Sequence, residues 1–208
     1  MRHSRVQHVL KAVGAGSILM VAAVAPASAH VGLGAVHTFS QGFLHPMNGL
    51  DHMIAMLAVG LYAANLGGRA LWLVPLAFVG TMIFGGLLGY YGWPLPMVEA
   101  GIGLSVVVMS MAIALGVRLP TVAAMALVGT FALFHGHAHG SEGAGLGIAF
   151  STYAAGFVVS TALLHVSGLA LGAGFKHVGA AQSSLLNRLT GGIGAIAGIS
   201  LLTGLLAA

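Results

Sequence analysis

The stretch ALWLVPLAFVGTMIFGGLLGYY, residues 70–91, runs from end to end without a charged side chain. A helix needs about 20 residues to cross a hydrocarbon core of about 30 Å, so this stretch is long enough to span a membrane. Further apolar stretches of comparable length lie at about 43–65, 97–116, 120–138, 145–172 and 188–207. We therefore predict an all-α integral membrane protein with six transmembrane helices in a bundle.

The composition of the whole chain supports this fold class. With 58% hydrophobic and 5% charged residues and a mean hydropathy of +1.01, the chain has too little polar surface to cover a soluble globule. Its apolar runs are continuous, without the alternation typical of a membrane β-barrel. The absence of cysteine excludes thiolate metal sites and thiol catalysis. The basic residues are scattered, so the high pI does not indicate a nucleic-acid partner.

Residues 1–29 have the pattern of a cleavable signal peptide, with a basic start, a short apolar run and Ala27-Ser28-Ala29 before the cleavage point. Residues 30–208 would then form the six-helix transmembrane domain. The alternative is an uncleaved first helix, which gives seven spans. The remaining basic residues all fall in loops that would face the cytoplasm, at Arg69, at Arg118 and in the 176–188 loop. We predict that the mature N- and C-termini both lie on the outer side of the membrane.

The stretch HPMNGLDHMIAM, residues 45–56, places two histidines and an aspartate at the outer end of the first predicted span. A charge inside a span costs at least about 2.5 kcal/mol on insertion scales, which favours a functional role. We expect His45 to lie just before the helix, with Pro46 in its first turn, and to fold back toward Asp51 and His52. Two imidazoles and a carboxylate suit Ni²⁺, Co²⁺, Zn²⁺ or Cu²⁺. The alternative is a capped helix start with interfacial histidines.

The stretch FHGHAHGSE, residues 134–142, carries the second cluster at the outer end of the fourth predicted span. His135, His139 and Glu142 share one helix face if the helix continues, whereas His137 points to the opposite side. We predict that the two clusters together form one metal site, with His45, Asp51, His52, His135, His139 and Glu142 as ligands. A histidine-rich interfacial loop is the alternative.

Both clusters also occur in a known family. The motifs H-x5-D-H at 45–52 and FHGxAHGxE at 134–142, with P-x-V-E at 96–99 and Y..GF...TALLH..G at 153–168, resemble the HupE/UreJ family of bacterial nickel permeases. The resemblance implies a protein of the bacterial inner membrane, which places both mature termini in the periplasm. It also implies uptake of nickel, or of cobalt in some members, for the maturation of hydrogenase or urease. It implies no permanent cofactor, because Ni²⁺ or Co²⁺ is the transported ion. Cytoplasmic nickel chaperones of those enzymes would be indirect partners, and His137 occupies a variable position of the motif.

Five residues are weaker candidates for metal binding or for the ion pathway: His30, His37, Glu99, His137 and His165. A solvated external segment is the alternative for the first two. A helix-dipole contact is the alternative for Glu99, and a structural role is the alternative for His165. No Walker motif is present, so we predict transport without ATP.

Two other functions fit some of the same residues. An intramembrane metal-dependent hydrolase would use two histidines and an acid as ligands, but the H-E-x-x-H pattern is absent. A haem-binding anchor would pair His52 or His139 with His165 as axial ligands. We rank both below a permease and predict that the chain is not an enzyme.

Overall fold

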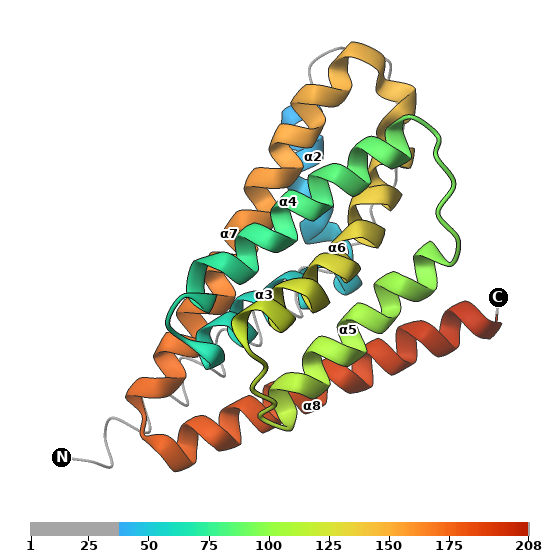
Figure 1. Ribbon diagram of the computed structural model, residues 1–208. Helices are drawn as coiled ribbons and strands as arrows, with labels where there is room; N and C mark the ends of the chain where they lie inside the picture. Colours follow the sequence, from blue (N-terminus) through green and yellow to red (C-terminus); the bar gives the residue numbers. More distant parts are fainter. Residues whose placement is uncertain (1–37, 208) are drawn as a thin grey trace. The chain divides into compact units, whose positions relative to one another are not determined.

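The computed structural model describes residues 38–207, and this part of the chain is helical without any β-strand. The predicted signal peptide, His30 and His37 lie outside the described residues. The helices are α2 (Thr38–Asn48), α3 (Leu50–Leu66), α4 (Ala70–Tyr90), α5 (Val98–Ala114), α6 (Thr121–Gly143), α7 (Phe150–His177) and α8 (Ala180–Ala207), with a short 3₁₀ helix, η1 (Ala144–Ala149), before α7 (Figure 1).

Four of these helices are long and apolar enough to cross a membrane: α4, α6, α7 and α8. A fifth span results if α2 and α3, which meet at an angle of 84°, are taken together. α5 is apolar but shorter, with 17 residues. In lipid a helix satisfies all of its own backbone hydrogen bonds, so these apolar runs fold as helices. The chain is thus a multi-pass helical membrane protein, and the number of six spans stays a prediction.

The first predicted span differs from our expectation. His45 does not precede the helix, because it lies in the last turn of the separate helix α2, and Pro46 lies inside that helix. α2 ends at Asn48, and Gly49 takes an extended conformation (φ −94°, ψ 117°) before α3 begins. This break at Gly49 separates His45 from Asp51 and His52 and lets the two parts of the motif approach the rest of the bundle from different directions.

The predicted internal loop at 176–188 is also mostly helical. α7 continues to His177 and α8 begins at Ala180, so only a short turn at Gly179 (φ +103°) remains between them. Alanine, leucine and glutamine are good helix formers, and they extend both helices beyond the apolar runs.

Close backbone packing at glycines joins the helices in pairs. α4 lies along α6, α3 along α7, and α5 along α8. A Cβ atom added at Gly85 of α4 would collide with the carbonyl of Leu133 in α6, so the two backbones are in direct contact. In a membrane the lipid is as apolar as the protein core, so helices associate mainly by close packing. Small residues allow their backbones to approach closely enough for this packing. The outward faces carry large apolar side chains, for example Trp72, Leu76 and Phe84 of α4, as expected for a surface in lipid.

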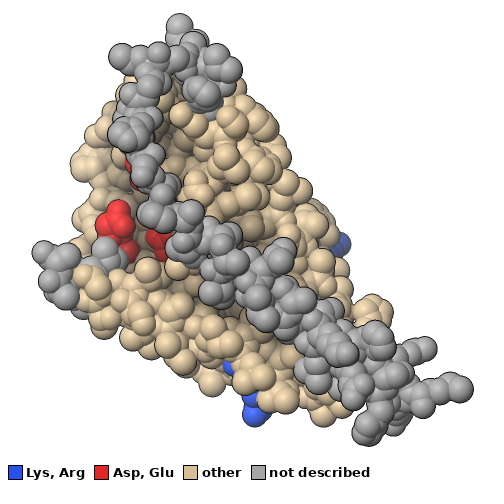
Figure 2. All heavy atoms as spheres, turned by 180° about the vertical axis from the view of Figure 1, so that it is seen from behind, with Lys and Arg blue, Asp and Glu red and all other residues tan. Residues whose placement is uncertain are grey.

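The charged side chains are separated on the molecule. In Figure 2 the acidic side chains gather in one region of the visible face, whereas the visible Lys and Arg atoms lie at its edges away from them. This separation agrees with the sequence pattern, which places Asp51, Glu99 and Glu142 near one end of the predicted spans.

Candidate metal site

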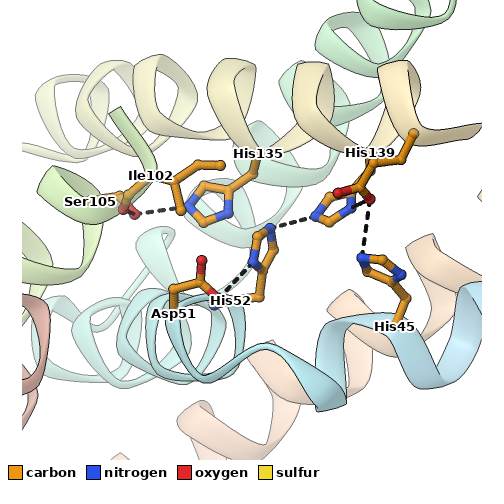
Figure 3. A network of polar contacts seen from close by, with 8 residues as sticks. His45, Asp51, His52, Ile102, Ser105, His135 and His139 are labelled. Carbon is orange, nitrogen blue, oxygen red and sulfur yellow. Dashed lines mark hydrogen bonds and ion pairs between the residues drawn. The ribbon is translucent and has the colours of Figure 1, made fainter. Parts of the chain in front are cut away.

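Asp51 and His52 begin α3 and form a hydrogen-bonded pair (Figure 3). Asp51 Oδ1 accepts the backbone N–H of His52 at 2.8 Å and lies 3.1 Å from Nδ1 of the same ring. An ionised carboxylate only accepts hydrogen bonds, so Nδ1 carries a proton and Nε2 is the nitrogen left free to bind a ligand. The carboxylate therefore fixes the orientation of the ring and leaves Nε2 available as a ligand.

His139 of α6 repeats this arrangement with its own carboxylate. Its Nδ1 lies 3.0 Å from Glu142 Oε2, three residues later on the same helix, so Nε2 is again the free nitrogen. The Nε2 atoms of His139 and His52 face one another at 2.5 Å. Two lone pairs at this distance repel unless a proton or a cation lies between them.

The 2.5 Å between the two Nε2 atoms is slightly shorter than the separation of two nitrogen ligands of one metal ion. Nitrogen ligands of one ion, each about 2.0–2.1 Å from it, lie about 3 Å apart. The pair of imidazoles, each held from behind by a carboxylate, matches the outer-shell arrangement that orients histidine ligands in metal proteins. His52 and His139 lie on helices that are far apart in the sequence, so only the folded chain brings their rings together.

His45, in the last turn of α2, approaches the carboxylate of Glu142. Its Nε2 lies 3.2 Å from Glu142 Oε2, and its ring stands edge-on to His139 with centroids 4.7 Å apart. Ligand atoms of His45, His139 and Glu142 all lie within 4.8 Å of one another, close enough to hold one ion. We expected His45 to fold back toward Asp51 and His52, and this expectation was wrong because the break at Gly49 turns it toward the second cluster.

His135 extends the row of imidazoles by a third ring. The Ser105 hydroxyl of α5 donates to the Ile102 carbonyl at 2.6 Å, so it accepts from Nε2 of His135 at 2.8 Å. Nδ1 of His135 is buried and has no hydrogen-bond partner in the described part of the chain. The ring stands edge-on to His52, with centroids 4.6 Å apart. Three neighbouring imidazoles from α3 and α6 thus lie side by side (Figure 3).

Exposure decreases along this row. The side chains of Glu142 and His45 are 53% and 40% exposed, those of His52 and His139 are 9% and 6% exposed, and His135 is fully buried. An ion arriving from outside would meet Glu142 and His45 first. A donor set dominated by imidazole suits Ni²⁺, Co²⁺, Zn²⁺ or Cu²⁺ and disfavours Mg²⁺ and Ca²⁺.

Of the weaker candidates, His137, Glu99 and His165 lie within the described residues, where no hydrogen bond or ion pair joins them to this cluster. His137 points away, as predicted, and its Nε2 donates to the Trp93 carbonyl at 2.7 Å in the connection between α4 and α5. Glu99 is exposed in the first turn of α5 and forms no ion pair within residues 38–207. His165 is buried in α7 beside Phe78, a ring that also lies beside His135. Metal binding by any of the candidates, including the six in the main cluster, stays a prediction.

Comparison of the sequence with known proteins identifies the family of this chain. The sequence pattern of the HupE / UreJ protein family matches residues 18–201. The chain belongs to the HupE/UreJ family. It is similar to Protein HupE of Rhizobium leguminosarum bv. viciae, with 44% identity over 204 residues that cover 98% of this chain and 100% of that protein. No solved structure gives a significant match. The resemblance of the two histidine motifs to this family is thereby confirmed.

Sequence analysis missed several residues around the HupE/UreJ motifs. Phe157 of α7 packs its ring against His139, with centroids 4.2 Å apart, and also lies beside His45 and His52. Ser105 orients His135 from α5. Phe157 lies in the Y..GF motif, which could have indicated it. Ser105 stands in an apolar run, and nothing in its neighbourhood distinguishes it from a packing residue.

Proposed function

We propose that this member of the HupE/UreJ family is a permease for a divalent transition-metal ion, Ni²⁺ or Co²⁺. The observation that carries the proposal is the facing pair of imidazole nitrogens on His52 and His139, each oriented by a carboxylate. The family and the multi-pass helical fold support transport rather than catalysis.

The two overlapping donor sets suggest a path for the ion. Glu142 and His45, both half-exposed, would capture the ion from the periplasm, with His139 as a third ligand. Rotation of His139 would then bring the ion between its Nε2 atom and His52. A transport site must also release its ion, and the sharing of His139 between the two sets keeps either one incomplete.

The membrane potential can drive this movement. A divalent cation that moves inward gains about 4.6 kcal/mol per 100 mV, twice the value for one elementary charge. We propose uptake through the bacterial inner membrane, with both mature termini periplasmic, without ATP and without a permanent cofactor. Cytoplasmic nickel chaperones that serve hydrogenase or urease would receive the ion.

The proposal predicts the order of competition in a transport assay. Proteoliposomes with the purified protein should accumulate radioactive Ni²⁺ when an inside-negative potential is imposed. Excess Co²⁺ should reduce the uptake strongly, because it accepts the same nitrogen and oxygen ligands, whereas excess Mg²⁺ should leave it unchanged. Uptake that Mg²⁺ suppresses as well as Co²⁺ does would contradict an imidazole-based site.

The proposed orientation predicts the compartments of the loops. Reporter fusions after Arg69, Arg118 and Gly179 should report the cytoplasm, because basic loops stay inside. Fusions after Pro94 and Gly145 should report the periplasm. If fusions at the two ends of one helix reported the same compartment, that helix would not cross the membrane and the proposed arrangement of six spans would be wrong.

A further inference from the structure

His165 lies in the middle of α7 and is 1% exposed. Both of its ring nitrogens are buried, and neither has a hydrogen-bond partner within residues 38–207. Buried polar groups in proteins nearly always have such partners, and a buried group without one needs an explanation. The imidazole of His165 makes no hydrogen bond that would stabilise the described fold. It also does not belong to the outer site, which consists of His45, Asp51, His52, His135, His139 and Glu142.

The position of His165 places it inward of the outer site. Phe157, which packs against His139, precedes His165 by two helical turns on α7. At a rise of 1.5 Å per residue, His165 lies about 12 Å further along the helix. The ring of Phe78, on α4, lies next to both imidazoles, with centroid distances of 5.8 Å to His135 and 5.0 Å to His165. His165 and His135 thus share Phe78 as an aromatic neighbour.

Other donor atoms accompany His165 at this depth. Ser160, five residues before His165 on α7, has a buried hydroxyl without a hydrogen-bond partner among the described residues. Thr161, one turn before His165, donates to the Met82 sulfur at 3.8 Å. The buried ring of Phe78 packs against His165 itself. Nitrogen, hydroxyl and thioether groups therefore lie in an interior that offers His165 no hydrogen bond.

Tight backbone packing fixes the level of His165 against α3. A Cβ atom at Gly60 would collide with the His165 carbonyl, and one at Gly168 would collide with the Leu57 carbonyl. The backbones of α3 and α7 are therefore in direct contact at the level of His165.

We propose that His165 is a second binding station for the transported cation, which reaches it from His135 past the ring of Phe78. This inference rests on the proposed function, since it names a further site for the same divalent ion. A single imidazole among weak donors binds an ion less tightly than the outer site does. A station between the outer site and the cytoplasm needs this property, because conduction requires release.

Cysteine at position 165 gives a direct test, because the chain contains no other cysteine. A thiol that coordinates a metal is deprotonated. Purified His165→Cys protein with added Co²⁺ should therefore show a near-ultraviolet thiolate-to-cobalt charge-transfer band. Ser167→Cys is the matched control, because Ser167 lies two residues away on the exposed face of α7 and should give no band.

Transport by a second variant tests the same station without a thiol. His165→Leu has a similar volume but no donor atom, so we expect Ni²⁺ uptake to fall at least tenfold while equilibrium Ni²⁺ binding to the purified protein keeps its outer-site affinity. Leu164→Val, a small packing change at the neighbouring buried position, should change uptake less than twofold.

The outcomes separate this inference from the proposed function. Absence of the cobalt band in His165→Cys, or wild-type uptake by His165→Leu, would overturn the second station and leave the permease intact if the unmodified chain still transports. Failure of the unmodified chain to take up any metal would overturn the proposed function and the second station with it.

Discussion

Replacement of His139 by alanine is expected to reduce Ni²⁺ or Co²⁺ uptake by more than about 100-fold at an unchanged amount of protein in the membrane. His139 takes part in both donor sets, facing His52 through Nε2 and contacting Glu142 through Nδ1. Loss of an outer-shell partner alone costs about 10- to 100-fold in metal affinity or activity, so loss of a shared ligand should exceed that range. Initial uptake rates, normalised to membrane protein by immunoblot, measure the effect.

His137→Ala is the matched control for this experiment. His137 lies on the same helix only two residues away, but it faces the Trp93 carbonyl outside the cluster. Its replacement should lower uptake by less than about threefold.

Uptake by Asp51→Asn should lie between that of these two variants. We expect a loss of about 10- to 100-fold, because Asp51 orients His52. Equal damage from His137→Ala and His139→Ala would show that the motif acts as a histidine-rich loop rather than as a defined site.

The sequence was sufficient to predict the elements that depend on local pattern. Long apolar runs gave the fold class, because a span needs only length and the absence of charge. The spacing of His135, His139 and Glu142 placed them on one face, and α6 does continue to Gly143 to preserve that spacing. The same spacing placed His137 on the other side, where the structure has it.

The contacts between helices could not be predicted from the sequence. In a soluble helix the polar face reveals which side is buried, but in lipid both the core and the surroundings are apolar. The contact of His45 with Glu142 depends on the 84° bend between α2 and α3 and on the packing of α2 against α7. Neither the bend nor the packing of α2 against α7 leaves a periodic pattern in the sequence. The sequence therefore named the residues of the cluster but gave the wrong neighbours for His45.

Gly140→Ala is expected to abolish most uptake although it removes no ligand. A Cβ atom at Gly140 would collide with the backbone of Gly86 in α4, and backbone atoms cannot move aside without separating the two helices. Gly140 directly follows His139, so a shift of α6 would move the Nε2 atom away from its position opposite His52. We expect uptake to fall at least tenfold, and equilibrium binding of Ni²⁺ to the purified variant to weaken in parallel.

Gly86→Ala tests the same helix contact from the other side. A Cβ atom at Gly86 would meet only the Gly136 carbonyl, at 3.5 Å, which is an ordinary van der Waals distance. This variant should therefore keep uptake within about twofold of the unmodified chain, although the two glycines face the same gap between α4 and α6. A purely general need for small residues between these helices would make both variants equally damaging. Tolerance of Gly86→Ala together with loss in Gly140→Ala would instead show that transport depends on how closely the turn carrying His139 approaches α4.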